Sequence, residues 1–256
     1  MGFYDLSKEQ RVDLVHTIES DILRDLQKRQ TETILKYFSD EDTYIRKAGY
    51  LGVGKIYKDN KIGSSSIITL LNQLLESELE KVRQTTINAA GELGKINFEN
   101  VEYFFDKGLF DEHHSVRNAV IGSIKKMGEK NPTPVLNWAK KYLHHPDKEV
   151  RREICHGIEL RGRTHPQDIL PLLKELQYDP TARVKNTLIH VLGQIAYKKG
   201  CLAIVVKELR TWENKELVEK ALDEIVDVHH RYKNFAVLTQ NQAVAYIDEN
   251  YGRKNK

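Results

Sequence analysis

A repeat of about 34 residues is the feature of this sequence that most restricts its fold. A β-branched residue followed by a long, mostly basic polar residue recurs along the chain, and we call the second members the anchors: Arg46, Arg83, Arg117, Arg151, Lys185 and Glu219. The intervals between successive anchors are 37, 34, 34, 34 and 34 residues. Such near-equal spacing over 256 residues indicates one structural unit repeated along the chain.

Each repeat contains two apolar segments separated by a short polar turn. The first segments fall at 33–38, 66–75, 101–109, 135–143, 169–176 and 203–209. After a turn such as SDEDT or HHPDKE, the anchor opens a second segment with the 3.6-residue apolar spacing of a helix. Prolines at Asn131-Pro132 and His165-Pro166 mark two of the joins between repeats. Paired helices of this period stack into an α-solenoid.

We therefore expect an all-α fold, a right-handed α-solenoid of about six helix pairs that forms a single domain over residues 1–256. Capping helices should cover both ends, because a terminal repeat otherwise exposes its stacking face. The expected segments are an N-terminal helix at about 9–28, repeats at about 29–60, 61–97, 98–131, 132–165, 166–200 and 201–234, and a C-terminal helix at about 239–251.

Composition excludes several classes of protein. Hydrophobic residues make up 40% of the chain, which is too much for a disordered protein. No apolar run approaches the roughly 18 residues of a membrane span, and the N-terminus MGFYDLSKEQR lacks the pattern of a secretory signal. Cys155 and Cys201 lie far apart and outside any CxxC motif. We expect a cytoplasmic protein without a membrane partner, a metal or a cofactor.

The second helices predict which residues face a ligand. Positions 1, 4, 8, 11 and 12 residues after each anchor share the side opposite the apolar stripe. Second helices usually line the concave surface of such stacks, so these positions should form the floor of a groove. We expect the following residues, at these positions or beside them, to bind DNA: Lys47, Lys58, Lys95, Asn118, Lys125, Lys126, Arg152, Arg161, Arg163 and Lys198.

Glycine recurs on this side of the second helices. It stands at position 8 as Gly54, Gly91 and Gly193, and at position 11 as Gly94, Gly128 and Gly162. A glycine inside a helix costs about 0.5–1 kcal/mol relative to alanine, so its repeated use requires a reason. Either bare backbone lets a bulky ligand approach, or adjacent second helices pack closely there.

Charge is distributed unevenly along the chain. Residues 61–116 carry a local charge of −4, whereas residues 117–163 carry +6. A basic stretch on a solenoid suits a polyanion, because lysine and arginine neutralise phosphates and release counterions. The alternative is a solvated basic face. The anchor arginines are a separate case, and we expect them to pair with acids of the turns.

The turn acids and anchors resemble those of HEAT repeats, as in Asp42 with Arg46, Asp111 with Arg117 and Asp147 with Arg151. The stretch Val116–Arg163 is also similar to the HEAT-like repeat superfamily of DNA alkylation repair proteins, of the AlkC and AlkD type. The residues that carry this similarity are Val116, Arg117, Ala119, Val120, Lys130, Asn131, Pro132, Val135, Leu136, Val150, Arg151 and Arg152.

The resemblance implies a C-shaped solenoid that cradles duplex DNA and excises cationic N3- or N7-alkylated purines. That activity uses an aromatic surround and a carboxylate. AlkD-type glycosylases place a tryptophan one helical turn before an aspartate, but here Trp138 precedes Tyr142, and Trp212 precedes Glu216 in the last repeat. Glu159 is the candidate catalytic carboxylate, or else a structural partner of nearby arginines.

An aromatic cage around Glu159 is not evident, because Tyr50, Tyr57 and Tyr197 lie toward the two ends of the groove. The favoured hypothesis is therefore a monomeric, non-catalytic protein that binds duplex, forked or four-way-junction DNA. The alternatives are an alkylpurine DNA glycosylase with a divergent site and a HEAT scaffold that binds a protein. Adjacent histidine pairs, such as His144 and His145, are expected to be loop residues rather than metal ligands.

Overall fold

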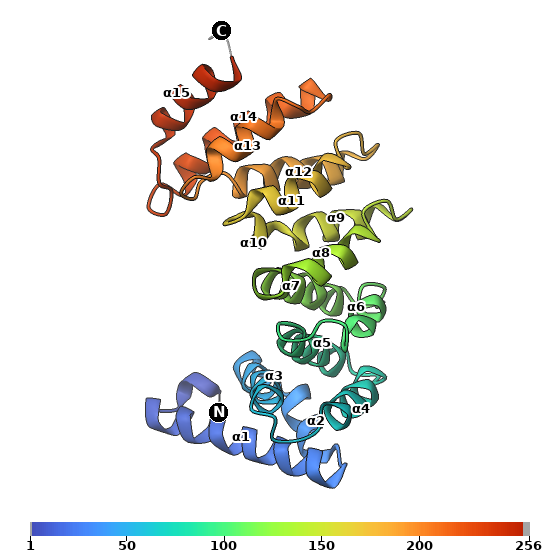
Figure 1. Ribbon diagram of the computed structural model, residues 1–256. Coiled ribbons are helices and arrows are strands. Elements are labelled where there is room, and N and C mark those ends of the chain that lie inside the picture. Colours follow the sequence, from blue (N-terminus) through green and yellow to red (C-terminus); the bar gives the residue numbers. More distant parts are fainter. Residues whose placement is uncertain (1, 253–256) are drawn as a thin grey trace. The chain divides into compact units, whose positions relative to one another are not determined.

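The computed structural model describes residues 2–252, and these residues form helices joined by short turns, without a strand (Figure 1). The all-α architecture of stacked helix pairs is therefore confirmed. After the 3₁₀ turn Phe3–Asp5, the helices are α1 Lys8–Lys28, α2 Glu32–Ser39, α3 Thr43–Lys58, α4 Ser64–Leu75, α5 Glu80–Gly94, α6 Glu102–Gly108, α7 His114–Lys130, α8 Pro132–Lys140, α9 Lys148–Gly157, α10 Glu159–Gly162, α11 Pro166–Lys174, α12 Ala182–Gln194, α13 Cys201–Leu209, α14 Lys215–Arg231 and α15 Gln240–Tyr251.

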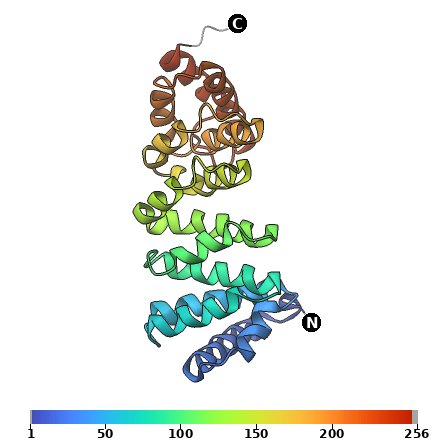
Figure 2. The same ribbon diagram turned by 90° about the vertical axis from the view of Figure 1, so that its right-hand side faces the viewer.

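The chain divides into two compact units, Met1–Pro134 and Val135–Lys256. In the first unit, α1 lies where the N-terminal capping helix is expected, and it packs on α2 and α3. The second helices α3, α5 and α7 pack successively on one another. Both ribbon views show the helices of this unit stacked in chain order (Figure 1 and Figure 2).

In the second unit, the corresponding stack consists of α9, α12 and α14, while α11 packs against α13. Helix α15 packs on α13 and α14 at the end of this unit. The fourth repeat differs from the continuous second helix that its sequence predicts. Its helix is divided at Ile158 into α9 and the one-turn α10, directly after Gly157, a residue with low helix propensity.

Helix starts follow from side chains that satisfy the first backbone N–H groups. The Asp42 carboxylate accepts a hydrogen bond from Tyr44 N at 2.7 Å, which opens α3. Asp147 accepts one from Glu149 N at 2.8 Å, which opens α9. Asp42 and Asp147 are therefore N-caps that fix where α3 and α9 begin, whereas the N-cap of α7 is His113 and not the turn acid Asp111.

The anchor arginines form a structural ladder, but the contacts that all four share are with backbone carbonyls of the turns and not with the turn acids expected from the sequence. The Nη1 atoms of Arg46, Arg83, Arg117 and Arg151 each donate to the carbonyls five and six residues earlier in the preceding turn. Two of them also reach an acid in the next repeat: Arg83 Nε lies 2.7 Å from Asp111 Oδ2, and Arg151 Nε lies 2.5 Å from Asp179 Oδ2. Each of these arginines thus stabilises the turn that precedes it, and Arg83 and Arg151 also connect that turn to the next repeat.

The recurrent glycines serve helix packing. A Cβ added at Gly54 would lie 2.5 Å from Glu92 Cβ, and one added at Gly91 would lie 2.6 Å from Ser123 Oγ. Added Cβ atoms at Gly94, Gly162 and Gly193 would likewise collide with Met127, Ile169 and Glu224. The structure thus favours close packing, and not ligand approach, as the reason for these glycines. Among residues 2–252, no helix combines the length and apolarity that a membrane span requires.

Candidate nucleic-acid interface

Three of the lysines predicted to bind DNA come together in the first unit. Lys47 on α3, Lys95 directly after α5 and Lys126 on α7 belong to successive repeats. The Lys126 ammonium lies 5.7 Å from the centroid of the Tyr50 ring, and its pKa responds to the charges of both Lys95 and Lys47. We call Lys47, Lys95 and Lys126 the lysine cluster.

The electrostatics of the lysine cluster are those of a site with surplus positive charge. Loss of water around the Lys126 ammonium lowers its pKa; Glu92 opposes this shift, and Lys95 and Lys47 reinforce it. Glu92 is the acid within the cluster, and its carboxylate pairs with Lys95 at 2.5 Å. Burial raises the pKa of Tyr50, and Glu92 adds to that shift. Lys95 and Lys126 thus interact with Glu92, and Lys47 adds a third positive charge near Lys126, so an anion that approaches the cluster finds uncompensated charge.

The other residues of this unit that were predicted to bind DNA lie outside the lysine cluster. Lys58 at the end of α3 and Asn118 on α7 are exposed, and no described contact joins either of them to the lysine cluster. Lys125 is half-buried on α7, beside Lys126 in sequence.

The predicted basic residues of the second unit are mostly paired within the protein. Arg152 Nε lies 2.9 Å from Glu149 Oε2, and Arg161 Nη2 lies 2.6 Å from Asp168 Oδ2. Lys198 lies over the Tyr197 ring, 4.8 Å from its centroid. Because their charges are already compensated, Arg152 and Arg161 offer less attraction to a phosphate than the lysine cluster does.

Glu159 is held by an arginine and shielded from solvent. Its side chain is 2% exposed, and its Oε1 accepts a hydrogen bond from Arg163 Nε at 2.9 Å. Arg163 also donates from Nη2 to Gln194 Oε1 at 3.0 Å. This geometry favours the interpretation of Glu159 as a partner of Arg163 over that of a carboxylate exposed to a substrate.

Solved structures of other proteins share this fold. AlkD2 from Streptococcus mutans aligns over 77% of this chain and 97% of its own, at 18% identity and a TM-score of 0.54. The fold is AlkD-like. The protein smu.31 from Streptococcus mutans UA159 covers 70% of this chain and 94% of its own, at 19% identity and a TM-score of 0.50. No family model matches the sequence, and no curated protein matches it either.

The tryptophans do not form an aromatic surround within this AlkD-like fold. Trp138 and Trp212 are 1% and 0% exposed, so both belong to the core. Exposed aromatic rings lie instead beside Lys47, where Tyr4 and Tyr44 stand edge to face at 4.5 Å between centroids. They line a cavity of about 330 Å³ together with Phe3, Lys47 and Lys55. Tyr4 and Tyr44 lie outside the groove positions of the second helices, so the repeat pattern gives no signal for this site.

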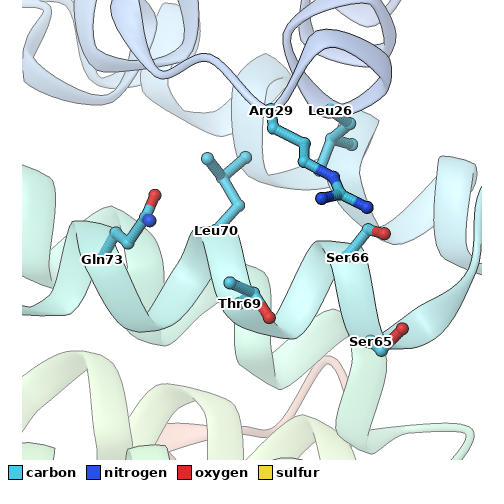
Figure 3. A pocket seen from close by; sticks show the side chains of 7 residues that line it. All are labelled: Leu26, Arg29, Ser65, Ser66, Thr69, Leu70 and Gln73. Carbon is cyan, nitrogen blue, oxygen red and sulfur yellow. The ribbon is translucent and has the colours of Figure 1, made fainter.

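A second cavity in the first unit is polar. It measures about 290 Å³ and lies between the C-terminal end of α1 and the start of α4. In Figure 3, the Arg29 guanidinium extends toward the Ser66 hydroxyl, with Ser65 before it and Thr69 after it on α4. Arg29 is exposed, and it occupies the left-handed C-cap position of α1.

Proposed function

We propose that this protein binds DNA through the lysine cluster, as a sequence-independent, phosphate-directed interaction, and that it does not excise bases. The observation that carries the proposal is the grouping of Lys47 and Lys95 around Lys126, from three successive repeats, with Glu92 as the acid that pairs with Lys95. Like charges so close repel one another, and a polyanion relieves that repulsion. The AlkD-like fold supports a role related to that of DNA repair proteins.

The exposed aromatic rings next to Lys47 extend this interface. Tyr4 and Tyr44 are 61% and 44% exposed. An unstacked nucleobase gains about 1–3 kcal/mol by stacking on an aromatic side chain. A surface that combines lysines with exposed rings therefore suits forked or four-way-junction DNA, in which bases lie outside a continuous stack.

Two observations support the absence of base excision. Glu159 is buried and salt-bridged to Arg163, so its carboxylate does not face a substrate. Trp138 and Trp212 lie in the core, where neither can contact a cationic base. The alkylpurine release that the AlkD-type resemblance implies uses a carboxylate and an aromatic surround that contact the base.

The test is fluorescence anisotropy with labelled duplex, forked and four-way-junction DNA at about 50 mM salt. We expect binding to all three, and at least about tenfold weaker binding by the double variant Lys47→Glu with Lys126→Glu, since charge reversal adds repulsion. The matched control is Lys8→Glu with Lys36→Glu, two exposed lysines of the same unit outside the cluster. Equal loss in both variants, or no binding by the unaltered protein, would contradict the proposal.

Base excision is tested separately with DNA that contains N7-methylguanine or N3-methyladenine. We expect no release of either base by the unaltered protein. Release that is lost in Glu159→Gln would instead establish the glycosylase alternative.

A further inference from the structure

Two histidines and a buried glutamate converge in the second unit, between α9–α10 and α12. His156 Nε2 lies 3.2 Å from Glu159 Oε2. One nitrogen of His156, one oxygen of Glu159 and one nitrogen of His190 all lie within 4.8 Å of one another. We propose that His156, Glu159 and His190 form a binding site for one divalent transition-metal ion of the Zn²⁺ type.

The repeat geometry explains why the two histidines meet. His156 and His190 each stand five residues after their anchors, Arg151 and Lys185, so they occupy the same register on adjacent second helices. In the next repeat this register is occupied by Glu224, whose Oε1 lies 3.4 Å from His190 Nδ1. In the first three repeats the same register carries Leu51, Asn88 and Gly122. The row of metal-ligating side chains is therefore a property of the second unit.

Glu159 occupies a helix position at which three other repeats have glycine. It stands eight residues after its anchor, where other repeats place Gly54, Gly91 and Gly193. In those repeats a Cβ would point into the next second helix, as Gly193 does into Glu224. A glutamate at this register is thus directed toward α12, and its side chain is 2% exposed. Arg163 Nε donates to its Oε1, while its Oε2 faces His156.

The donor set matches a known coordination chemistry. Two histidines and one glutamate are a ligand set of zinc sites that keep an open position. Ligand atoms of a tetrahedral zinc lie about 3.3 Å apart, and the His156–Glu159 distance of 3.2 Å already meets this value. His190 closes the remaining gap by rotation of its side chain, which is 43% exposed.

The surrounding charges orient the ligands. Glu224 Oε1 lies 3.4 Å from His190 Nδ1, the place from which carboxylates orient zinc-bound histidines. Arg163 fixes the Glu159 carboxylate by its other oxygen, and Arg231 pairs with Glu224. His156 is 35% exposed, so an ion can enter from solvent.

The test is isothermal titration of the full-length, chelator-treated protein with Zn²⁺, in the absence of DNA. We expect saturation at one ion per chain, and at least about tenfold weaker binding in both His156→Gln and His190→Gln, because each removes one ligand. A parallel titration with Co²⁺ should develop the visible absorption of a protein-bound ion and lose it in the same variants. Because the assay contains no DNA, its outcome is independent of the proposed DNA binding.

The matched control is His230→Gln, an exposed histidine on α14 outside the cluster, which should bind Zn²⁺ as the unaltered protein does. Glu159→Gln should also weaken binding. Far-UV circular dichroism of each metal-free variant separates loss of a ligand from loss of fold. If Glu159→Gln unfolds, the substitutions at the partly exposed His156 and His190 still test the proposal. No Zn²⁺ binding by the unaltered protein, or undiminished binding by both His156→Gln and His190→Gln, would overturn the proposal.

Discussion

Arg151 and Asp179 form a nearly buried ion pair between consecutive repeats, with side chains that are 10% and 3% exposed. Arg151→Ala leaves the Asp179 carboxylate without its main partner in a low-dielectric site. We expect it to lower the free energy of unfolding by about 3–5 kcal/mol. Urea denaturation followed by circular dichroism at one temperature measures this loss.

The control for this prediction is Arg183→Ala, which breaks the exposed pair between Arg183 and Glu149 in the same unit. An exposed pair contributes about 1 kcal/mol or less, so this variant should stay close to the unaltered protein. The double variant Arg151→Met with Asp179→Leu should recover much of the loss, because it removes both charges together. A loss below about 1 kcal/mol in Arg151→Ala would show that the ladder is not an important source of stability.

The same pair predicts a pH dependence. Burial alone would raise the pKa of Asp179, but hydrogen bonds from Arg151 and Thr181 outweigh it, so the folded-state pKa lies below the ordinary value. Stabilisation by this carboxylate is therefore fully present above the unfolded pKa of about 3.9. It is lost as the pH falls through the folded pKa, because the unfolded chain binds the proton more readily. Asp179→Asn should unfold more easily at neutral pH and show a shallower loss of stability on acidification.

Single residues also show which features could be predicted from the sequence and which could not. The structural role of the anchor arginines could be predicted, because they recur at fixed spacing, but their bonds to the turn carbonyls could not. The charge of residues 117–163 could not be judged from a sequence window, because Arg151 and Arg161 pair with Asp179 and Asp168 beyond it. Formal charge along the chain thus overstates the free positive charge in space. The lysine cluster could be predicted only in part: Lys47 and Lys95 stand at groove positions 1 and 12, whereas Lys126 stands nine residues after its anchor, beside a groove position.

Close packing of second helices predicts opposite effects for two glycine substitutions in the first unit. At Gly91 an added Cβ meets Ser123 Oγ at 2.6 Å and Ser123 Cβ at 2.8 Å. At Gly122, within α7, an added Cβ meets nothing within 4 Å. We expect Gly122→Ala to stabilise the protein by about 0.5–1 kcal/mol through helix propensity, and Gly91→Ala to destabilise it by about 1–2 kcal/mol through overpacking.

The two alanine variants serve as each other's control, because both make the same chemical change inside a helix. Thermal unfolding should shift to a higher midpoint for Gly122→Ala and to a lower one for Gly91→Ala. A stabilising Gly91→Ala would mean that α5 and α7 are not as close as their contacts indicate, and the ligand-approach interpretation of the glycines would return.

Helical elements were predictable because apolar spacing, N-capping acids and prolines agree on where each helix lies. The break between α9 and α10 was not, since a single Gly157 within a helical pattern is no reliable signal of a break. The row of His156 and His190 could have been found from the shared register. It was missed because histidines were compared with their neighbours in sequence and not with the equivalent residues one repeat away.

At the scale of the whole molecule, repetition of one unit explains both the AlkD-like fold and the placement of charge. Stacking of the repeats brings side chains from different repeats together. Lys47, Lys95 and Lys126 therefore form a cluster although each belongs to a different repeat. Repetition does not by itself determine activity, because a substitution at one register, as at Glu159, changes the chemistry of one repeat and leaves the stack intact.

The lysine cluster makes a quantitative prediction for binding by the whole protein. Each phosphate neutralised releases counterions, so the slope of log K against log salt falls by about 0.9 in magnitude for each contact removed. We expect Lys47→Ala and Lys126→Ala each to reduce the slope by about 0.9 on duplex DNA, and Lys95→Ala to reduce it by less, because Glu92 already pairs with Lys95. Anisotropy titrations over a series of salt concentrations give the slopes, with Lys36→Ala as the control on the same unit. Slopes that stay unchanged in all three cluster variants would place the DNA contacts on another surface of the protein.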